Sequence, residues 1–200
     1  MLLLSLKRLV RSIRAGVRVR LYTLRGLQVG LNSTIDRPYY IEASKFLFIG
    51  DRTSIHSNAY ITPITNYADV RYSPEIRIGN DVYIGRHVFL VALNSLVIED
   101  GCVLSEHVYI SDNAHGYDPE GGPILQQPLA SRGPVHIGRR CFLGYRSVVM
   151  PGVQLGEHCV VGANSVVTRS FPPYSMLVGC PAKRIKVYSK ETREWISTSS

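Results

Sequence analysis

Residues 137–167 read IGRRCFLGYRSVVMPGVQLGEHCVVGANSVV, and a branched aliphatic residue stands at every sixth position of this stretch. These aliphatics are Ile137, Leu143, Val149, Leu155, Val161 and Val167, and a glycine follows four of them. A helix repeats about every 3.6 residues and a strand every two, so neither alone produces a period of six. The period predicts a chain that makes one short strand and one turn every six residues.

Three such units would complete a coil of 18 residues with the shape of a triangular prism. The large aliphatic fills the inside of the prism, and the small residue four positions later fits near a corner. Successive coils stack about 4.8 Å apart through parallel strand hydrogen bonds. One coil cannot bury its apolar face alone, so the stack itself forms the core. The sequence therefore predicts an all-β fold, a parallel β-helix.

The same six-residue spacing of aliphatics continues toward the N-terminus and predicts five to six coils in total. Earlier triples of aliphatics are Val29, Ile35 and Ile41, then Ile49, Ile55 and Ile61, then Ile78, Ile84 and Leu90, then Ile98, Leu104 and Ile110. Extra residues enter only between triples, at one corner of the prism. The two long insertions are 62–77 and about 113–134. Insertions collected on one edge usually build the binding face.

The basic charge of the chain is concentrated near its N-terminus. The formal net charge is +8, and seven Lys or Arg residues but no acidic residue precede Asp36. Apolar residues in 1–16 follow a helical spacing, but this segment is too short and too charged to span a membrane and lacks the order of a signal peptide. Two interpretations stay open: this helix packs on the domain, or residues 1–25 contact an anionic membrane surface.

We therefore expect three parts in the chain. These are a basic amphipathic segment 1–28, a β-helix domain 29–185 with the loop 113–134, and a tail 186–200. The protein is expected in the cytoplasm, either free or peripheral on the inner face of the membrane. No nucleic-acid partner is expected.

His115 is the candidate catalytic residue among the six histidines. His87, His107 and His158 occupy turn positions of the repeat. His56 directly follows Ile55, one of the aliphatics at the six-residue spacing, and His136 directly precedes another, Ile137. His115 alone departs from a coil wall into the long insertion. A histidine in a surface loop is the plain alternative, but this position favours a functional role.

Several motifs resemble the hexapeptide-repeat acyltransferases. They are N-A-H-G-Y-D at 113–118, G-P-V-H-I-G at 133–138, L-G-Y-R-S-V-V-M-P-G-V at 143–153, V-G-A-N-S-V-V-T at 161–168 and V-G-C-P-A-K-R-I at 178–185. Within that family the chain is similar to sugar O-acetyltransferases of the maltose and galactoside type and to lipopolysaccharide- and capsule-biosynthesis acetyltransferases. The resemblance covers about residues 49–187. It implies a left-handed β-helix, acetyl-CoA as co-substrate, and a homotrimer with active sites between subunits.

The resemblance also implies roles for individual residues. His115 matches the catalytic histidine, which would take the proton of an acceptor hydroxyl. The main chain near Gly144 and Tyr145 would supply an oxyanion donor. Positions matching the CoA contacts are Gly144, Tyr145, Ala163, Thr168, Lys183, Arg184 and Lys186. Tyr145 is bulkier than the family's usual residue, and lysines replace frequent arginines. A solvated basic face is the alternative for the lysines.

Candidate acceptor-binding residues are Asn94, Tyr117, Asp118 and Arg132. Asn94 has an equally plain interpretation as a turn former. Asp118 could orient the imidazole of His115, but a loop aspartate before Pro119 is more often a turn former. Cys102, Cys141 and Cys159 occupy the small corner position, which predicts buried packing in a reduced protein. No C-x-x-C pair occurs, and the H-x4-H spacing of related zinc enzymes is missing, so no metal is expected.

These features predict an acetyl-CoA-dependent O-acetyltransferase that acts on a carbohydrate hydroxyl in surface polysaccharide biosynthesis. Two alternatives stay open. One is an N-acetyltransferase of an amino-sugar nucleotide, because an amine would need the same base. The other is a non-catalytic β-helix used for assembly, in which a histidine-bearing insertion would not be expected.

Overall fold

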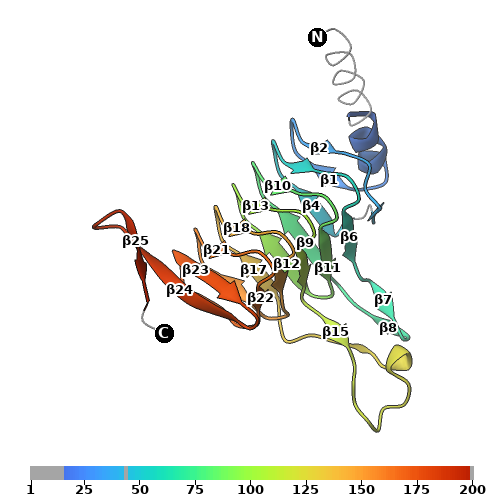
Figure 1. The fold of residues 1–200 in the computed structure, drawn as a ribbon. Coiled ribbons are helices and arrows are strands. Elements are labelled where there is room, and N and C mark those ends of the chain that lie inside the picture. Colours follow the sequence, from blue (N-terminus) through green and yellow to red (C-terminus); the bar gives the residue numbers. More distant parts are fainter. Residues whose placement is uncertain (1–15, 43–44, 199–200) are drawn as a thin grey trace.

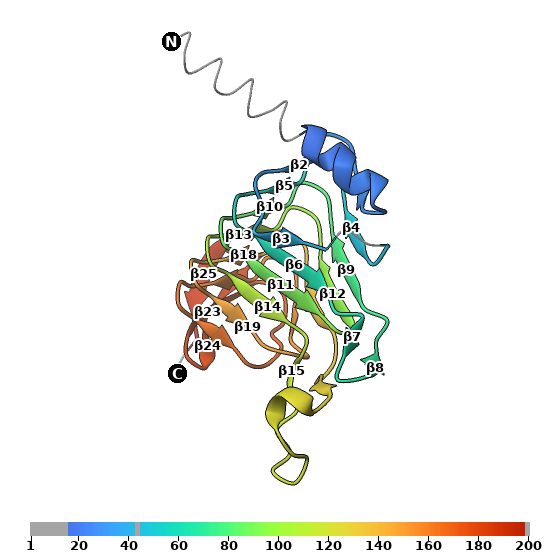
Figure 2. The ribbon, with the colours of Figure 1, turned by 90° about the vertical axis from the view of Figure 1, so that its right-hand side faces the viewer.

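A computed structural model describes residues 16–42 and 45–198, and they wind into a left-handed parallel β-helix with three sheets (Figures 1 and 2). Sheet 1 comprises β1 (Gln28–Val29), β4 (Leu47–Ile49), β9 (Glu75–Ile78), β12 (Ser95–Ile98), β17 (Val135–Ile137) and β20 (Gln154–Leu155). Sheet 2 comprises β2 (Thr34–Ile35), β5 (Ser54–Ile55), β10 (Tyr83–Ile84), β13 (Val103–Leu104), β18 (Phe142–Leu143), β21 (Val160–Val161), β23 (Ser175–Gly179), β24 (Ala182–Ser189) and β25 (Glu194–Ser197). Sheet 3 comprises β3 (Tyr40–Ile41), β6 (Tyr60–Pro63), β11 (Phe89–Ala92), β14 (Tyr109–Ser111), β19 (Val148–Val149) and β22 (Val166–Val167).

The core consists of the aliphatic residues predicted at every sixth position, which we call the aliphatic ladder. Every ladder residue from Ile35 to Val167 is buried, and Val29 in the first coil is half-buried against them. Ladder residues of successive coils face each other in the parallel register, for example Ile84 with Leu104. The predicted period and phase are therefore confirmed, and the predicted all-β fold with them.

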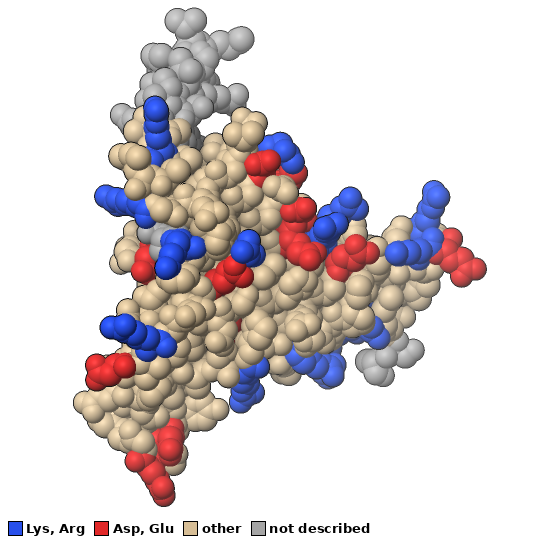
Figure 3. Space-filling view, turned by 180° about the vertical axis from the view of Figure 1, so that it is seen from behind, with Lys and Arg blue, Asp and Glu red and all other residues tan. Residues whose placement is uncertain are grey.

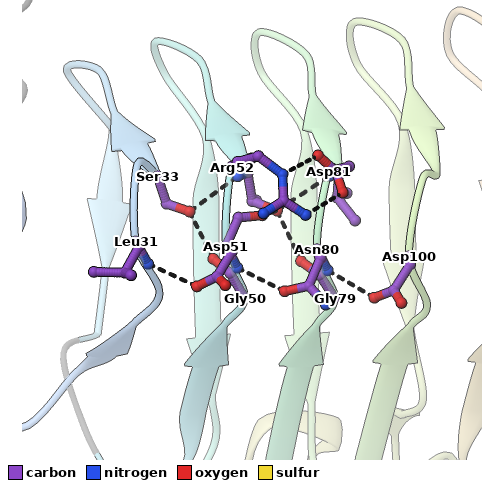
Figure 4. Close-up of polar contacts among 11 residues, drawn as sticks. Leu31, Ser33, Gly50, Asp51, Arg52, Gly79, Asn80, Asp81 and Asp100 are labelled. Atoms are coloured by element: carbon purple, nitrogen blue, oxygen red, sulfur yellow. Dashed lines mark hydrogen bonds and ion pairs between the residues drawn. The ribbon is translucent and has the colours of Figure 1, made fainter.

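The edge between sheet 1 and sheet 2 is closed by a ladder of side chains (Figure 4). Asp51 Oδ1 accepts the N–H of Leu31 at 2.7 Å, and Asn80 Oδ1 accepts the N–H of Asp51 at 2.8 Å. Asp100 repeats this contact one coil later with the N–H of Asn80, also at 2.8 Å. A Cβ on Gly79 would lie 2.5 Å from Asp100 Oδ1, so only glycine fits between these side chains.

An exposed ion pair lies at the same edge of the prism (Figure 4). The Arg52 guanidinium donates to both carboxylate oxygens of Asp81, each at 2.7 Å. These contacts hold the pKa of the Asp81 carboxyl below its ordinary value. Both side chains are exposed, so the pair contributes little to stability.

The N-terminal helix covers residues 16–24 within the described part of the chain, and residues 1–15 of the expected basic segment lie outside it. Val19 and Tyr22 pack on the core, and Arg18 Nη1 donates to Ile35 O at 2.7 Å. This face of residues 16–24 therefore packs on the domain. The helix expected over residues 1–16 lies outside the described residues except for Gly16, so its packing stays a prediction. No helix of residues 16–42 and 45–198 is long and apolar enough to cross a bilayer.

The C-terminal strands extend sheet 2 in the antiparallel sense. β24 pairs with both β23 and β25, and it runs from Ala182 to Ser189. It therefore crosses the expected boundary at 185/186, and the tail is a continuation of the sheet.

The long insertions leave the prism at the edge between sheet 3 and sheet 1, which we call the insertion edge. Residues 62–77 form a hairpin of β7 (Asn66–Tyr67) and β8 (Val70–Arg71) between β6 and β9. Residues 113–134 contain β15 (Ala114–His115), the 3-10 helix η1 (Ile124–Gln126) and β16 (Leu129–Ala130) between β14 and β17. Both project from the same side of the prism (Figures 1 and 2), as predicted.

Candidate active site

His115 lies at the start of the long loop, in β15, which pairs antiparallel with β16 through Leu129. Its side chain is exposed, and its Nδ1 lies 3.2 Å from the hydroxyl of Tyr67 on the β7–β8 hairpin. The two rings meet edge to face with centroids 5.5 Å apart. The hairpin thus supplies a polar partner for one side of the imidazole.

The contacts of Tyr67 determine which ring nitrogen of His115 carries the proton. The Tyr67 hydroxyl donates to Leu125 O at 3.1 Å. A phenol has a single proton to donate, so its oxygen accepts from an Nδ1–H of His115. This tautomer leaves a lone pair on Nε2, which makes no hydrogen bond within residues 16–42 and 45–198. A neutral imidazole held in this way can accept a proton from a molecule at the insertion edge.

The two long insertions support each other at a second point. The N–H of Leu129, in β16, donates to the hydroxyl of Tyr72 at 3.2 Å. Tyr72 follows β8 in the hairpin. The β15–β16 pair that carries His115 is therefore fixed to the hairpin from both of its strands.

Asp112 anchors the long loop to the prism and was missed in the sequence. Its side chain is fully buried, and it accepts the main-chain N–H groups of Leu93, Asn94 and Ser95 at 2.7, 2.7 and 2.9 Å. Ser131 Oγ donates to the Asp112 carbonyl from the far end of the loop. The only signal was an acidic residue at the first step out of a buried strand, and its partners lie a full coil away.

Asp118 stabilises a turn and does not orient the imidazole. Its Oδ1 accepts the N–H of Glu120 at 2.9 Å, and its main chain exchanges two hydrogen bonds with the buried Gln127 side chain, each at 2.9 Å. The turn-former interpretation is the one that the structure shows, because the nitrogen Nδ1 is held by Tyr67 instead. Gln127 closes the loop on itself.

The other expected acceptor residues surround the same edge. Asn94 is fixed through its main chain, which donates to Asp112 and accepts the N–H of Glu75 at 2.8 Å, while its side chain is exposed. Tyr117 is 68% exposed in the loop. Arg132 is exposed near the end of the loop. The structure thus brings Asn94 to the origin of the loop that carries His115.

Gly144 is not available as an oxyanion donor. Its N–H donates to Val161 O at 2.8 Å within the stack of coils. A Cβ on Gly144 would lie 2.8 Å from Ala163 N and Val161 O, so this glycine is required by the close approach of two coils. The repeat therefore uses the N–H of Gly144, and an oxyanion donor from the main chain near Tyr145 stays a prediction.

The remaining residues expected to contact CoA do not gather around His115 in one chain. Tyr145 and Ala163 are exposed at the edge between sheet 2 and sheet 3, where the Tyr145 ring contacts His107. Thr168 follows β22 and lies on the insertion edge. Lys183 and Arg184 are exposed on β24, with a half-buried Lys186 beside them. These positions lie on different sides of the prism.

The cysteines behave as predicted for packing residues. Cys102, Cys141 and Cys159 are buried, and their thiols donate to main-chain carbonyls at 3.1 to 3.3 Å, while Cys180 is exposed. Across residues 16–42 and 45–198, no three His, Cys, Asp or Glu side chains are placed to hold a metal ion together.

The coils of the C-terminal half match a known sequence family. Residues 134–169 match the hexapeptide repeat of succinyl-transferase. This segment of the chain is thus a hexapeptide repeat. The predicted resemblance to the hexapeptide-repeat acyltransferases is confirmed by similar proteins and solved structures.

Two curated relatives are similar to this chain over much of its length. A protein of Escherichia coli K12 named as a lipopolysaccharide biosynthesis O-acetyl transferase, WbbJ, is 34% identical over 123 residues, which cover 58% of this chain and 63% of that protein. The galactoside O-acetyltransferase of the same strain is 25% identical over 163 residues, which cover 82% of this chain and 77% of that protein. The chain spans less than two thirds of the first of these relatives.

The fold is also that of solved acyltransferases. A variant of AntD, an N-acyltransferase from Bacillus cereus in complex with dTDP and coenzyme A, superposes with a TM-score of 0.72 at 21% identity, covering 86% of this chain and 90% of that one. A maltose O-acetyltransferase from Clostridium difficile 630 gives a TM-score of 0.51 at 24% identity, covering 66% of each chain. These likenesses show that this chain shares their fold.

Proposed function

We propose that this protein is an acetyl-CoA-dependent O-acetyltransferase that acts on a carbohydrate hydroxyl in surface polysaccharide biosynthesis. The observation that carries the proposal is the Nε2 of His115, which has no hydrogen-bond partner in the described part of the chain while Nδ1 contacts Tyr67 at the insertion edge. The names of the two curated relatives, an O-acetyl transferase of lipopolysaccharide biosynthesis and a galactoside O-acetyltransferase, support the acceptor class.

In the proposed reaction His115 acts as a general base and then as a general acid. Nε2 takes the proton of the acceptor hydroxyl while that oxygen attacks the thioester carbonyl. The new C–O bond forms, the C–S bond breaks, and the imidazolium returns its proton to the CoA sulfur. The acetyl group passes directly between the two substrates, and no acyl-enzyme forms. General-base assistance of this kind contributes about 10²–10⁴-fold in rate.

The acceptor would be held by the side chains of Asn94, Tyr117 and Arg132, which are exposed in the long loop or at the corner where it is anchored. Each offers a hydrogen-bond donor to sugar oxygens, and the tyrosine ring also offers an apolar face. Asp118 contributes by shaping the turn that carries Tyr117.

Acetyl-CoA would reach His115 only through a second copy of the chain. Tyr145 and Ala163 lie on a different edge from His115, so one prism does not assemble both halves of a site. In a homotrimer of parallel prisms, the edge with Tyr145 and Ala163 of one copy can face the insertion edge of the next. The exposed Lys183 and Arg184 on β24, together with Lys186, would then bind the phosphates as point charges.

The acceptor atom is the part of this proposal that needs a direct test. The full-length protein is incubated with acetyl-CoA and matched saccharides that carry either hydroxyl groups only or one amino group, and products are analysed by mass spectrometry. We expect an increase of one acetyl group on the hydroxyl-only saccharides, in proportion to the free CoA thiol released. Acetylation confined to the amino sugars would replace the proposal by N-acetyl transfer. No thiol release with any acceptor, together with no binding of CoA, would favour an assembly role.

A further inference from the structure

The N-terminal helix presents an apolar stripe that points away from the prism. Val17, Leu21 and Leu24 are 55, 56 and 82% exposed, and their spacing of four and three residues places them on one face of the helix. The opposite face carries Val19 and Tyr22, which pack on the core. The helix therefore has two apolar faces, and the prism covers only one of them.

The charges beside this stripe have one sign. Arg20 and Arg25 are exposed next to it, and no acidic residue occurs anywhere in the first 35 residues. Arg18, by contrast, is held by Ile35 O and lies 3.9 Å from Asp36 of the prism. In Figure 3, Lys and Arg side chains project from the end of the molecule that carries the helix.

We propose that this face of the helix binds the surface of an anionic lipid bilayer. An apolar stripe flanked by arginines suits the boundary between headgroups and acyl chains, where the stripe enters the apolar layer and the guanidinium groups meet lipid phosphates. A second copy of the same helix fits this face less well, because Arg20 and Arg25 would meet their own counterparts with no acidic residue to compensate.

This orientation leaves the insertion edge accessible. The helix lies at the end of the prism formed by β1 and β2, while β15 projects from the side farther along the stack in both ribbon views (Figures 1 and 2). A chain docked through Val17, Leu21 and Leu24 would keep the loop of His115 uncovered. The inference does not depend on the proposed function, because binding to lipid is measured without any substrate.

The test uses flotation of the full-length protein with vesicles of phosphatidylcholine mixed with phosphatidylglycerol, and with vesicles of phosphatidylcholine alone. We expect binding to the anionic vesicles that falls at least about tenfold in the triple variant Val17→Ser/Leu21→Ser/Leu24→Ser and in Arg20→Glu/Arg25→Glu. Circular dichroism checks that each variant is folded. Equal binding of the stripe variant and the native protein would overturn the proposal, as would equal binding to both kinds of vesicle.

A control variant separates this stripe from general exposed hydrophobicity. Val103→Ser/Phe142→Ser/Ile196→Ser removes three exposed apolar side chains on sheet 2, and it should bind vesicles as the native protein does. Light scattering gives the mass of each protein in solution. If the stripe variant loses mass while neither it nor the native protein binds vesicles, the face is a contact between copies and the lipid proposal is wrong.

Discussion

The hydroxyl of Tyr67 lies 3.2 Å from Nδ1 of His115, although the two residues belong to different insertions and are 48 positions apart. Neither residue is part of a hexapeptide coil. The orientation of the imidazole therefore depends on a contact between two loops, and the prism contributes by bringing the origins of both loops to one edge.

Replacing His115 by alanine should lower turnover by at least about a hundredfold while folding and CoA binding stay intact. The side chain is exposed, so its removal leaves no cavity, and only the proton acceptor is lost. Steady-state kinetics with acetyl-CoA measure the effect. His158→Ala is the matched control, because that histidine stacks on Tyr174 near the C-terminal coils. Full activity of His115→Ala would refute the mechanism.

Tyr67→Phe should lower kcat roughly tenfold with little change in KM for acetyl-CoA, because one hydrogen bond that holds the imidazole is lost. The nitrogen shifts of His115 in NMR should change from an Nδ1–H toward an Nε2–H tautomer. Tyr188→Phe serves as the control, since Tyr188 packs against Trp195 far from the insertion edge. An unchanged tautomer in Tyr67→Phe would show that the hydroxyl does not set it.

Asp112→Ala should lower the free energy of unfolding by about 3 kcal/mol, because buried main-chain donors lose a charged acceptor. Urea denaturation measures the change. Asp118→Ala, in the exposed part of the same loop, should cost much less. Similar midpoints for the two variants would mean that the anchoring by Asp112 has been overestimated.

Shortening the loop by replacing 119–126 with a brief Gly-Ser linker should impair use of the acceptor far more than it affects stability. The coils remain stacked after the excision, and the entropy of closing a loop changes slowly with its length. Kinetics at varied acceptor concentration and thermal unfolding provide the two measurements. An unaltered acceptor KM and kcat would exclude the loop from recognition, and a collapse of the fold would show a structural role.

Gly144→Ala should destabilise the protein, since the added Cβ meets main-chain atoms of the next coil at 2.8 Å and those atoms cannot move alone. Thermal unfolding shows the effect as a lower midpoint. Gly16→Ala is the matched control, because its added Cβ has no atom within 4 Å from the described residues outside its own helix and chain neighbours. If Gly144→Ala keeps its midpoint but loses activity, the residue has a catalytic role beyond packing.

The fold could be predicted from the sequence because one physical constraint repeats in every coil. A buried aliphatic such as Ile84 and a small corner residue such as Val88 are required wherever strands stack at a fixed spacing, so the period carries the architecture. Breaks in that period located the insertion edge and, with it, His115.

The details of the site could not be predicted in the same way. Tyr67 and Asp112 act through contacts between loop segments that do not follow the six-residue repeat. Without a repeat, the sequence does not show which residues of these segments meet. The packing role of Gly144 could not be predicted for a related reason, since a glycine required for close stacking and a glycine used as a donor look alike in a sequence.

The side-chain ladder of Asp51, Asn80 and Asp100 has a consequence for how such a protein can diversify. It ties consecutive turns together, so a residue added there would put all later turns out of step. At the insertion edge the backbone returns to the same path after detours of different lengths. New substrate specificities can therefore arise by exchange of whole inserted segments, while the stacked coils that support them stay unaltered.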